Sequence, residues 1–290
     1  MPELPEVEHV KRGIEPRITN LIINDVQFSD AVYSGKANNK ATIIKGTTIE
    51  QFTDMCVNYR IDSVFRRSKY IIFKLINREN IQYMVGHLGM TGAYFVVSSI
   101  ESIPVLNYRK HWHAAFSLND GNKLIYSDIR RFGELRMMNE AMFETFNAQI
   151  APEPFSAEGQ AHYLSQLLLQ KYQNKPIKQV IMLHSVVSGC GNIYACEALH
   201  LARINPNTKV KALSKKRKLL LYEKIVFVLE EGIRYGGSTI SDYRNAEGES
   251  GTMQNRFNVY GKKVCGTCGH AITTKVIATR NTHYCTHCQK

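Results

Sequence analysis

Residues 265–288, CGTCGHAITTKVIATRNTHYCTHC, decide the fold of the C-terminal end of the chain. Two Cys-x-x-Cys pairs stand sixteen residues apart, and four thiolates at this spacing can surround one zinc ion as a tetrahedron. The stretch between the pairs predicts a β-hairpin whose tip, near residues 278–281, directs Arg280 outward. A closed four-sulfur site leaves no open coordination position, so we expect the zinc to be structural. Its predicted ligands are Cys265, Cys268, Cys285 and Cys288.

The composition of the whole chain indicates a globular protein with a polyanionic partner. Its 290 residues are 44% hydrophobic, and its formal net charge is +12 with a pI near 9.3. Such a surface attracts nucleic acid more often than other polyanions. We find neither an apolar run long enough to span a membrane nor a secretory signal, so we expect no membrane span and a cytoplasmic location. The three remaining cysteines have no partnered spacing and are expected to pack in the interior; they are Cys56, Cys190 and Cys196.

The first 138 residues or so have the pattern of a β-rich domain that begins with a helix. We predict this helix from Pro2 to about Arg12, ended by Gly13 and Pro16. After it, short apolar runs indicate strands, and Asn-Asp-Gly at residues 119–121 predicts a hairpin turn between the last two. The pattern favours a β-sandwich or barrel with the helix packed at its edge. The predicted strands are Val26–Phe28, Tyr70–Leu75, Ala93–Val97, His113–Leu118 and Lys123–Tyr126.

The second half of the chain has a helical pattern. Residues 147–155 lose periodicity and carry two prolines, which is typical of a linker. Ser156 and Ser214 are suitable helix N-caps, and Gly236-Gly237 ends the last helix. Residues 244–255 are polar and glycine-rich and predict a mobile loop. The predicted helices are 156–172, Ile177–Val187, Asn192–Ile204 and 214–235.

Together these patterns predict an α+β multidomain protein. An N-terminal β-sandwich domain with an N-terminal helix occupies residues 1–146, and the linker follows at 147–155. A helical domain spans residues 156–255, and the four-cysteine zinc finger spans residues 256–290.

The first eight residues, MPELPEVE, place a nucleophile beside carboxylates. An initiator Met before proline is usually removed, so the working N-terminus is expected to be the secondary amine of Pro2. An α-amino group titrates near pH 7.7–8.0 and is partly neutral at physiological pH. Its attack on an aldehydic carbon gives an iminium ion, an electron sink for elimination, and Glu3 and Glu6 could move protons beside it. The alternative interpretation is an ordinary helix start, in which proline and acids suit the first turn.

Several short motifs occur together in an order that identifies a family. They are MPELPEVE at 1–8, RRSKY at 66–70, HLGMTG at 87–92, SDIRRFG at 127–133, GCGNIYACEAL at 189–199, VYGK from Val259, and the cysteine tail with Arg280. On these motifs nearly the whole chain resembles the formamidopyrimidine-DNA glycosylases, bacterial base-excision enzymes for oxidised purines. The resemblance implies an N-terminal β-sandwich with an N-terminal helix, a helix–two-turn–helix domain and a zinc β-hairpin finger.

The resemblance also implies a covalent mechanism. Pro2 attacks the sugar carbon that carries the damaged base, and Glu3 moves protons during base release and ring opening. The iminium intermediate collapses by β- and then δ-elimination and leaves a one-nucleotide gap with phosphates at both ends. By the same resemblance Lys69 reaches the lesion and its flanking phosphate, and Arg280 grips phosphates around the lesion. From spacing alone, Lys69 is also compatible with a solvated strand edge, and Arg280 with a solvated turn position.

Other motif residues are expected to contact DNA. Met90, Arg130 and Phe132 match the family's wedge, which fills the base stack after the target nucleotide is extruded. Arg130 is expected to hydrogen-bond the orphaned cytosine. The turn in GCGNIYA exposes backbone N–H groups, and Asn192, which can cap the following helix, is expected to hold phosphate there. The segments 238–243 and 244–255 correspond to the part that closes over the everted base. The remaining expected DNA contacts are His87, His111, Arg131, Lys178 and Tyr260.

Three positions depart from the family's pattern. Leu183 stands where Asp is usual, Cys196 where Asp or Ser is common, and Ile129 where Pro is usual. None of them removes a group with a direct chemical role, but Leu183 loses a polar contact that could brace the phosphate turn. Retention of Met1 would make the Pro2 nitrogen an amide and would stop the mechanism.

We therefore interpret the sequence as a bifunctional glycosylase and abasic-site lyase for 8-oxoguanine and formamidopyrimidines in duplex DNA. It is expected to act as a monomer with one structural zinc ion, in the cytoplasm and associated with the nucleoid. Two alternatives stay open: an endonuclease VIII-like glycosylase for oxidised pyrimidines, and a zinc-containing protein that binds damaged DNA without cleaving it. PELPEVE and the wedge residues favour the purine enzyme over the first. Pro2 and Glu3, which binding does not need, separate the enzyme from the second.

Overall fold

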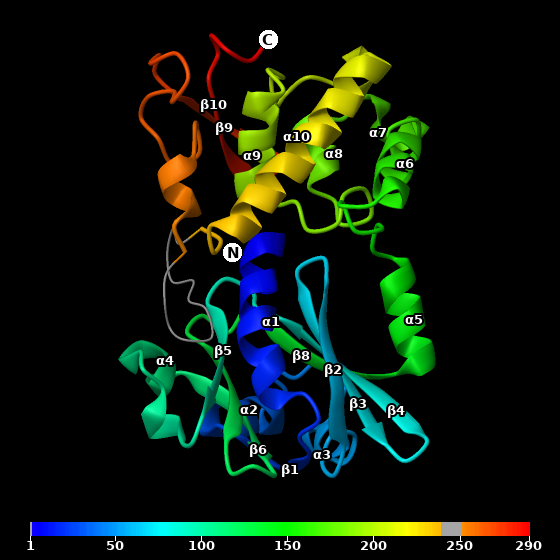
Figure 1. The fold of residues 1–290 in the computed structure, drawn as a ribbon, viewed down its shortest axis with the longest axis vertical. Coiled ribbons are helices and arrows are strands. Elements are labelled where there is room, and N and C mark those ends of the chain that lie inside the picture. Colours follow the sequence, from blue (N-terminus) through cyan, green and yellow to red (C-terminus); the bar gives the residue numbers. More distant parts are fainter. Residues whose placement is uncertain (1, 239–250) are drawn as a thin grey trace. The chain divides into compact units, whose positions relative to one another are not determined.

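The computed structural model describes residues 2–238 and 251–290, which form two compact units (Figure 1). The first unit contains Pro2, Glu6–Asn147, Ser238 and Gly251. The second unit contains Glu3–Pro5, Ala148–Gly237 and Thr252–Lys290. Each unit has its own hydrophobic core, the property expected of a folding domain.

The first unit contains the predicted β-sandwich, built from two four-stranded antiparallel sheets. Its strands are β1 (Ile23–Phe28), β2 (Arg60–Arg67), β3 (Tyr70–Asn77), β4 (Asn80–His87), β5 (Gly92–Val97), β6 (Trp112–Leu118), β7 (Lys123–Asp128) and β8 (Glu134–Asn139). One sheet has the order β2-β3-β4-β8 and the other has the order β1-β6-β7-β5. The turn predicted at residues 119–121 joins β6 to β7, and Gly121 adopts a φ of 89°, a left-handed conformation that favours glycine.

Both faces of each sheet are covered, which explains the continuous apolar runs in the sequence. In β3, Phe73 faces the core between the sheets, whereas Ile72 faces the outer side. Helix α5 (Glu140–Ala148) covers that outer side through Phe143, and α4 (Leu106–Lys110) covers the outer side of the other sheet. A strand buried on both sides needs apolar residues at successive positions rather than in alternation.

Helix α1 (Leu4–Ile18) is longer than the sequence predicts. The predicted end at Gly13 and Pro16 is wrong, because Ile14 and Ile18 continue the buried apolar stripe of the helix past both residues. Pro16 lies in the last turn, so its missing N–H removes a hydrogen bond from the end of the helix rather than from its middle. Burial of the stripe therefore outweighs both helix breakers.

Three strands of the first unit, β2, β4 and β8, have no counterpart among the predicted ones. In β2 only Ile61 and Val64 are fully buried, and the other positions carry mixed polar and apolar side chains. Neither strict alternation nor a continuous apolar run marks such a strand. Helices α2 (Asp30–Ala37), α3 (Ile49–Asp54), α4 and α5 likewise lie in stretches without a predicted element.

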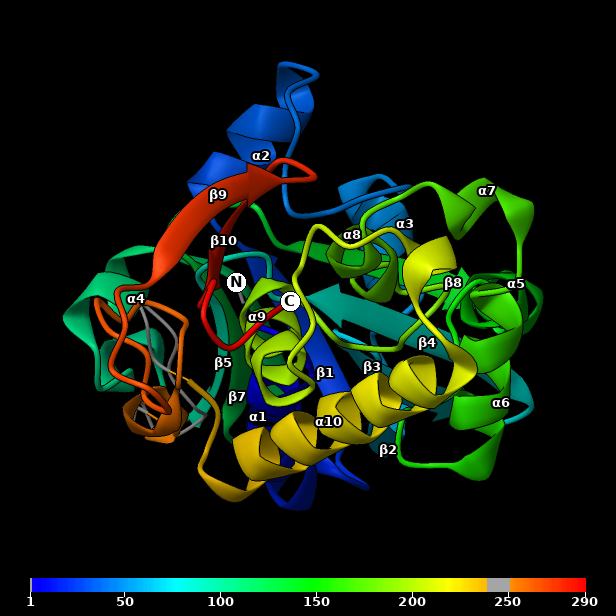
Figure 2. The ribbon, with the colours of Figure 1, turned by 90° about the horizontal axis from the view of Figure 1, so that it is seen from above.

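The described part of the second unit is helical up to its C-terminal hairpin, as predicted. Ser156 Oγ accepts a hydrogen bond from the Gly159 N–H (3.1 Å) and Ser214 Oγ from the Arg217 N–H (3.3 Å), so both serines cap helices. The helices are α6 (Ala157–Gln166), α7 (Gln170–Gln173), α8 (Ile177–Ile181), α9 (Asn192–Leu201) and α10 (Lys215–Arg234), with 3-10 turns η2 (Val210–Ala212) and η3 (Met253–Arg256). Helix α10 packs against α9 (Figure 2). Among the described residues, we find no helix of the length and apolarity needed to cross a membrane.

Three predicted helices are shorter than expected. The helix predicted over 156–172 ends at Gln166, because Leu167 is buried whereas Leu168 is 75% exposed and does not continue its stripe. The short helix α7 follows as a separate element. The helix predicted over Ile177–Val187 ends at Ile181, and the one predicted over Asn192–Ile204 ends at Leu201.

The predicted hairpin of the C-terminal finger is present as β9 (Thr273–Ile277) and β10 (Arg280–Tyr284). Its two-residue tip, Ala278-Thr279, has positive φ values of 49° and 63°, as tight hairpin turns require. Arg280 follows the tip and is exposed. The predicted mobile loop at 244–255 and the segment 238–243 lie largely outside the described residues.

Candidate functional site

The four predicted cysteines lie together beside the C-terminal hairpin and form a zinc-finger site. Their Sγ atoms are 3.9 Å apart between Cys265 and Cys288, 3.5 Å between Cys268 and Cys285, and 3.4 Å between Cys268 and Cys288. A tetrahedral zinc with Zn–S bonds of about 2.3 Å requires sulfur atoms about 3.8 Å apart, so the donor set fits this metal. With four protein ligands the zinc is structural.

Cys268 also lies near two imidazoles, those of His270 and His287. Their rings stack with centroids 4.1 Å apart and planes 8° apart. Parallel rings direct their in-plane nitrogen lone pairs side by side rather than toward one point, so this geometry does not form a second metal site.

The other three cysteines are packing residues, as predicted. Cys56 and Cys190 lie in the cores of the first and second units. Cys196 packs beside Cys265 and Cys285, and burial raises the pKa of its thiol to about 12. Cys196, a departure from the family's pattern, is therefore a buried packing residue.

Glu3 is buried at the start of α9, within the second unit. Its carboxylate accepts hydrogen bonds from the backbone N–H groups of Gly191 (2.8 Å), Ile193 (2.9 Å) and Tyr194 (3.4 Å). The unpaired N–H groups and the helix dipole both stabilise a negative charge there. These three N–H groups are thus occupied by a carboxylate of the chain itself. The prediction that Asn192 caps α9 is wrong, since Gly191 takes the N-cap position.

Asn192 joins three parts of the second unit. Its Oδ1 accepts a hydrogen bond from Lys178 Nζ (2.5 Å), and its Nδ2 donates to the Asn281 carbonyl (2.9 Å) and to the Tyr260 hydroxyl (3.3 Å). Arg280 directly precedes Asn281 in β10. The structure therefore brings two predicted DNA contacts, Lys178 and Tyr260, to the Asn192 side chain, and Arg280 is the residue before a third partner.

The surroundings of this cluster are partly dehydrated. Burial lowers the pKa of Lys178 and raises the pKa of Tyr260. An ammonium group in a site of low polarity attracts an anion more strongly than one in bulk water. Leu183, a departure from the family's pattern, packs against the core of the same unit.

Glu197 on α9 has a role that the sequence analysis missed. Its carboxylate accepts hydrogen bonds from the backbone N–H groups of Asn258 (2.8 Å), Val259 (3.0 Å) and Tyr260 (2.8 Å). These bonds fix the segment that carries Tyr260 against α9. The only sequence signal is a glutamate within the GCGNIYACEAL motif, and its partners lie 61 to 63 residues further along the chain.

In the first unit Lys69 occupies the two-residue turn between β2 and β3. Before the turn, Arg66 donates to the Ser68 carbonyl (3.0 Å) and to Glu8 Oε2 (2.9 Å), while Arg12 donates to Glu8 Oε1 (2.8 Å). Glu8 thereby ties the turn to α1. Burial raises the pKa of Glu8, but the two arginines outweigh burial and lower it overall.

His87 ends β4 opposite Tyr70, the first residue of β3. The centroids of the two rings are 5.0 Å apart, and His87 Nδ1 accepts a hydrogen bond from the Gly89 N–H (3.1 Å). Burial lowers the pKa of His87, and the nearby Lys69 lowers it further. The negative charge of Glu134 raises it but does not cancel these two effects. These effects favour the neutral form of His87, which lies at the same end of the sheet as Lys69.

Asp128 organises the loop after β7, which carries two of the predicted wedge residues. Its buried Oδ1 accepts hydrogen bonds from Thr91 Oγ1 (2.5 Å) and the Arg130 N–H (3.2 Å), and its Oδ2 accepts one from the Gly133 N–H (2.7 Å). The loop holds Phe132 with 60% of its surface exposed, and the Arg130 guanidinium carbon lies 4.9 Å from the centroid of that ring. Asp128 belongs to the SDIRRFG motif, but the motif alone predicts no role for it.

Met90 lies on a loop that contacts the Asp128 loop. Gly89 adopts a φ of 59°, and a Cβ atom there would lie only 2.4 Å from the Gly133 nitrogen and 2.5 Å from the Phe132 carbonyl carbon. This close approach brings Met90 and Phe132 to one end of the sandwich.

The two remaining predicted contacts of the first unit flank the same loop. The Asp128 N–H donates to the His111 carbonyl (2.9 Å), and the Arg131 N–H donates to the Asp128 carbonyl (3.3 Å). The predicted residues thus form one group in each unit. The first-unit group is Pro2, Lys69, His87, Met90, His111, Arg130, Arg131 and Phe132, and the second-unit group is Glu3, Lys178, Asn192, Tyr260, Arg280 and the zinc cysteines.

Glu6 contacts the end of the first described segment. Its Oε1 accepts hydrogen bonds from the Ser238 N–H (2.6 Å) and the Ser238 hydroxyl (3.0 Å). Glu6 therefore anchors Ser238, whereas Glu3 is the carboxylate that directly follows Pro2.

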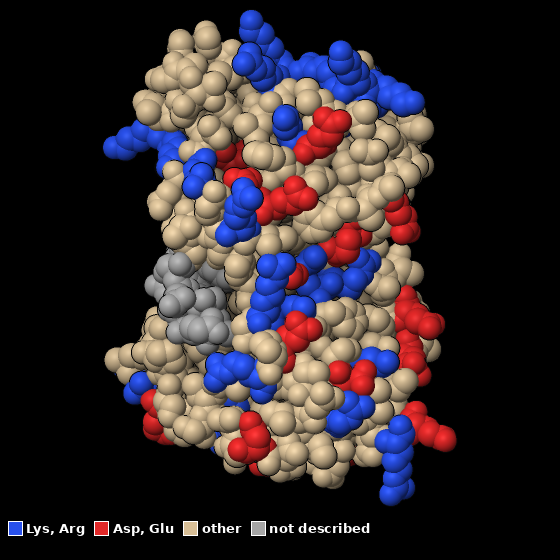
Figure 3. All heavy atoms as spheres, in the orientation of Figure 1, with Lys and Arg blue, Asp and Glu red and all other residues tan. Residues whose placement is uncertain are grey.

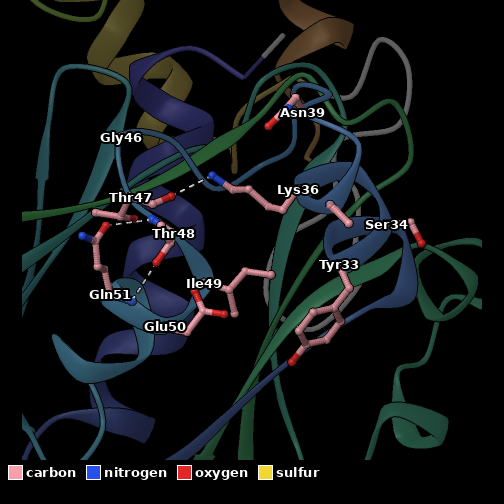
Figure 4. Close-up of a pocket in the computed structure, with 11 residues that line it drawn as sticks. Tyr33, Ser34, Lys36, Asn39, Gly46, Thr47, Thr48, Ile49, Glu50 and Gln51 are labelled. Carbon is pink, nitrogen blue, oxygen red and sulfur yellow. Dashed lines mark hydrogen bonds between the residues drawn. The ribbon is translucent and has the colours of Figure 1, made fainter.

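A pocket of about 920 Å³ lies between α2 and α3, apart from both groups of site residues (Figure 4). Lys36 Nζ donates to the Thr47 carbonyl (2.7 Å) at its wall. Thr48 and Gln51 form a reciprocal capping box at the start of α3, with hydrogen bonds of 3.0 and 3.1 Å. These polar groups serve the helix ends, and the predicted site residues lie elsewhere.

Comparisons with known proteins place successive parts of the chain in one family. The formamidopyrimidine-DNA glycosylase N-terminal domain matches residues 1–135, and the formamidopyrimidine-DNA glycosylase H2TH domain matches residues 150–244. A zinc finger found in FPG and IleRS matches residues 262–290. The formamidopyrimidine-DNA glycosylases of Bacillus licheniformis and Cytobacillus firmus are 35% and 36% identical to this chain over 296 residues, and the alignments cover all of each chain.

Solved structures agree over the same length. A Lactococcus lactis FPG mutant in complex with DNA that contains Fapy-dG has a TM-score of 0.85 and 31% identity, and the match covers all of both chains. The wild-type Lactococcus lactis protein in complex with DNA that contains an oxidised pyrimidine has a TM-score of 0.83 and 31% identity. These matches confirm the predicted β-sandwich with its N-terminal helix, the helix–two-turn–helix domain and the zinc finger.

Proposed function

Because the chain belongs to the formamidopyrimidine-DNA glycosylase family, we propose that it removes oxidised purines from duplex DNA as a bifunctional glycosylase and abasic-site lyase. One observation carries the proposal: Glu3, the residue after Pro2, is buried and held by three backbone N–H groups at the start of α9. A protein that only binds DNA has no need of a carboxylate fixed beside an N-terminal secondary amine.

The proposed reaction begins at the Pro2 nitrogen. It attacks C1′ of the damaged nucleotide, and the bond from C1′ to the base breaks while Glu3 moves protons. Protonation of O4′ then breaks the C1′–O4′ bond, which opens the sugar ring and gives the iminium ion. The iminium ion draws electrons from C2′, so loss of a C2′ proton expels the 3′ phosphate. A second elimination expels the 5′ phosphate, and hydrolysis returns the Pro2 amine. The products are the free base, the sugar fragment and a one-nucleotide gap with a phosphate at each end.

Cations of both units bind the DNA backbone in this proposal. Lys69, on a turn tied to α1 through Glu8, reaches the lesion and its flanking phosphate. Arg280 and Asn192 hold phosphates near the lesion, and the contacts of Asn192 with the Lys178 ammonium and the Asn281 carbonyl support this role. The finger therefore acts as a mount for Arg280.

The wedge is proposed at the exposed end of the β-sandwich. Phe132 has the exposure that insertion into a base stack requires, and Arg130 lies over its ring. Met90 fills the space of the extruded nucleotide, and Arg130 hydrogen-bonds the orphaned cytosine. The partner is damaged duplex DNA, bound by a monomer in the cytoplasm near the nucleoid. His87, His111 and Arg131 add contacts in the first unit, and Tyr260 adds one in the second.

Borohydride trapping tests the covalent step, because borohydride reduces an iminium ion to a stable amine. The zinc-loaded protein is incubated with three duplexes: one with 8-oxoguanine opposite cytosine, one with an oxidised pyrimidine and one undamaged. We expect a covalent adduct mainly with the first. A Pro2→Gln variant, which retains Met1 because glutamine is large, should give no adduct, whereas Pro5→Ala in the same helix start should give the full amount.

The other outcomes each contradict part of the proposal. An adduct mainly with the oxidised pyrimidine would assign the protein to the endonuclease VIII-like alternative. No adduct from correctly processed, zinc-loaded protein that still binds the damaged duplex would favour a non-catalytic binder. An adduct of equal yield from Pro2→Gln would exclude Pro2 as the nucleophile.

Glu3 needs a test that separates chemistry from folding. In Glu3→Gln the amide NH₂ group faces backbone donors, so we expect both base excision and the stability of the second unit to fall. An abasic-site duplex, from which the base is already absent, bypasses excision. If Glu3→Gln cleaves that duplex at the wild-type rate while it fails on 8-oxoguanine, the loss lies in the proton transfers of base release. Equal losses on both substrates would indicate misfolding instead.

A further inference from the structure

The second unit carries a strongly basic surface. Residues 159–222 contain ten lysines and arginines but a single carboxylate, Glu197, which is buried and hydrogen-bonded to residues of its own unit. In Figure 3 blue atoms gather at the end of this unit where α10 begins. We refer to this surface as the basic band, and its exposed members are Lys171, Lys175, Arg203, Lys209, Lys211, Lys215, Lys216 and Lys290.

Backbone contacts place these cations beside one another. The Val210 N–H donates to the Lys175 carbonyl (3.1 Å), so the segment after α7 runs beside η2. The turn η2 leads directly into Ser214, the N-cap of α10. At the other side, Arg217 Nη2 donates to the Arg203 carbonyl (3.0 Å) and to the Lys290 carbonyl (3.3 Å). Three stretches, residues 171–175, residues 203–217 and Lys290, thus lie beside one another and contribute to this basic surface.

The basic band lacks the partners that normally neutralise surface cations. In the part of the chain that the structure describes, no member of the basic band forms an ion pair with a carboxylate. The first turn of α10 contains no acidic residue and instead begins Lys-Lys-Arg-Lys. Cations at a helix N-terminus oppose the helix dipole, which favours anions there. A bound polyanion would reduce both the repulsion among these cations and their unfavourable interaction with the dipole of α10.

The basic band borders the Asn192 cluster, formed by Asn192, Lys178 and Tyr260, and extends away from it. Asn192 is the first residue of α9, whereas Arg203 follows its last turn. A helix of ten residues is about 15 Å long, so α9 separates Arg203 from Asn192. The Lys178 N–H donates to the Pro206 carbonyl (3.3 Å) and Pro176 pairs with Lys209, so Lys209 lies next to the cluster. The contacts proposed around the lesion therefore do not account for this charge.

We propose that the basic band is a second binding surface for the phosphate backbone of duplex DNA, outside the lesion-bearing part. The choice of duplex DNA rests on the proposed function, and the charge itself fits any long polyanion. Binding there is independent of sequence and lesion, because lysines on separate segments contact phosphates as point charges. Its effect is to hold the protein on undamaged DNA between lesions.

A charge-neutralising variant tests the proposal. Lys209→Gln/Lys215→Gln/Lys216→Gln removes three members of the basic band, and these changes relieve the start of α10, so folding is retained. The matched control is Lys40→Gln/Arg78→Gln/Lys110→Gln, which removes three exposed cations from the first unit. Affinity for a long undamaged duplex is measured over a range of salt concentrations.

For the basic-band variant we expect the slope of log K against the logarithm of the salt concentration to become less negative by about three. The affinity at low salt should fall roughly tenfold or more. The control should change the slope by less than about one. On a short duplex that covers only the lesion, the basic-band variant should excise the base in a single turnover at the wild-type rate. If the wild-type protein itself failed to excise the base, that result would contradict the proposed function and not the basic band. Equal slopes for the variant and the wild type, or equal losses in both variants, would overturn the proposal. The proposal would also be overturned if the basic-band variant lost affinity for single-stranded RNA but kept the wild-type affinity for duplex DNA.

Discussion

At the residue scale, Glu197 is the clearest case of a buried carboxylate with a positioning role. Glu197→Gln keeps the size of the side chain but points an NH₂ group at backbone donors. We expect the free energy of unfolding to fall by about 2 kcal/mol, because at least one buried N–H loses its acceptor. Urea unfolding measures this change. The control is Glu223→Gln, an exposed glutamate on α10, and equal midpoints for the two variants would contradict the prediction.

Glu8 gives a prediction about pH. Its pKa is lowered in the folded protein by Arg12 and Arg66 despite the opposing effect of burial. A lowered folded pKa means that the stabilisation is present above the unfolded pKa, near 4.3, and is lost as the pH falls through the folded pKa. The free energy of unfolding of Glu8→Gln should therefore be about 1 kcal/mol below that of the wild type at pH 7 and equal to it at strongly acidic pH.

Unfolding midpoints of wild type and Glu8→Gln, measured from pH 7 downward, check this prediction. Glu79→Gln serves as the control, since Glu79 is exposed. A difference between wild type and Glu8→Gln that persisted in strong acid would show that the loss has a cause other than charge.

The residues that sequence analysis finds and misses differ in where their partners lie. The zinc cysteines are recognisable because a few residues of spacing define the whole site. Asp128 and Glu197 are not, because a carboxylate that accepts backbone hydrogen bonds has the same letters as a solvated one. Most partners of Glu197 lie more than sixty residues away, and only the fold shows that they meet. The proposed roles of Pro2 and Lys69 stay predictions.

At the element scale, four of the five predicted strands are buried on both sides, and the exception is β1. Apolar residues at successive positions in β3, β5, β6 and β7 mark them clearly. The unpredicted β2 and β8 expose part of their surface, so their apolar residues are too few to define a period. In α1 the signal is the reverse: two local helix breakers predict an early end, but a buried stripe continues the helix to Ile18.

The finger is the element most dependent on its metal. Its hairpin buries few apolar residues, and structural zinc contributes about 10–16 kcal/mol to the folding of such modules. Removal of zinc by a chelator should unfold the hairpin and separate the Asn281 carbonyl from Asn192. Limited trypsin digestion should then cleave at Lys275 and Arg280 before the rest of the chain, and added zinc should restore protection.

Variants make the same point without a chelator. Cys285→Ser should lose the zinc, whereas Cys56→Ser, in the core of the first unit, should retain one zinc ion per chain. Unchanged trypsin resistance in zinc-free Cys285→Ser would show that packing alone folds the finger.

At the scale of the whole molecule, composition predicts the partner class but not where the charge lies. The net charge is +12, and residues 159–222 carry +9 of it. Only the fold shows that these cations converge on one surface of the second unit. The same holds for the site residues, whose motifs are spread over the whole chain and form one group in each unit.

The two separate cores predict how the molecule loses its structure. Phe116 is buried in the core of the first unit and Leu199 in that of the second. Replacing either residue by alanine should lower the free energy of unfolding by about 2–5 kcal/mol, and only in the unit that contains that residue. Hydrogen exchange should rise in residues 6–147 for Phe116→Ala and in residues 148–237 and 252–290 for Leu199→Ala. Helix α1 sharpens the test, because Leu4 packs in the second core and Val7 in the first. Exchange at the first turn of α1 should follow Leu199→Ala, and exchange at its later turns should follow Phe116→Ala. If either variant raised exchange equally throughout the chain, the two cores would form one cooperative unit, and stability could no longer be assigned core by core.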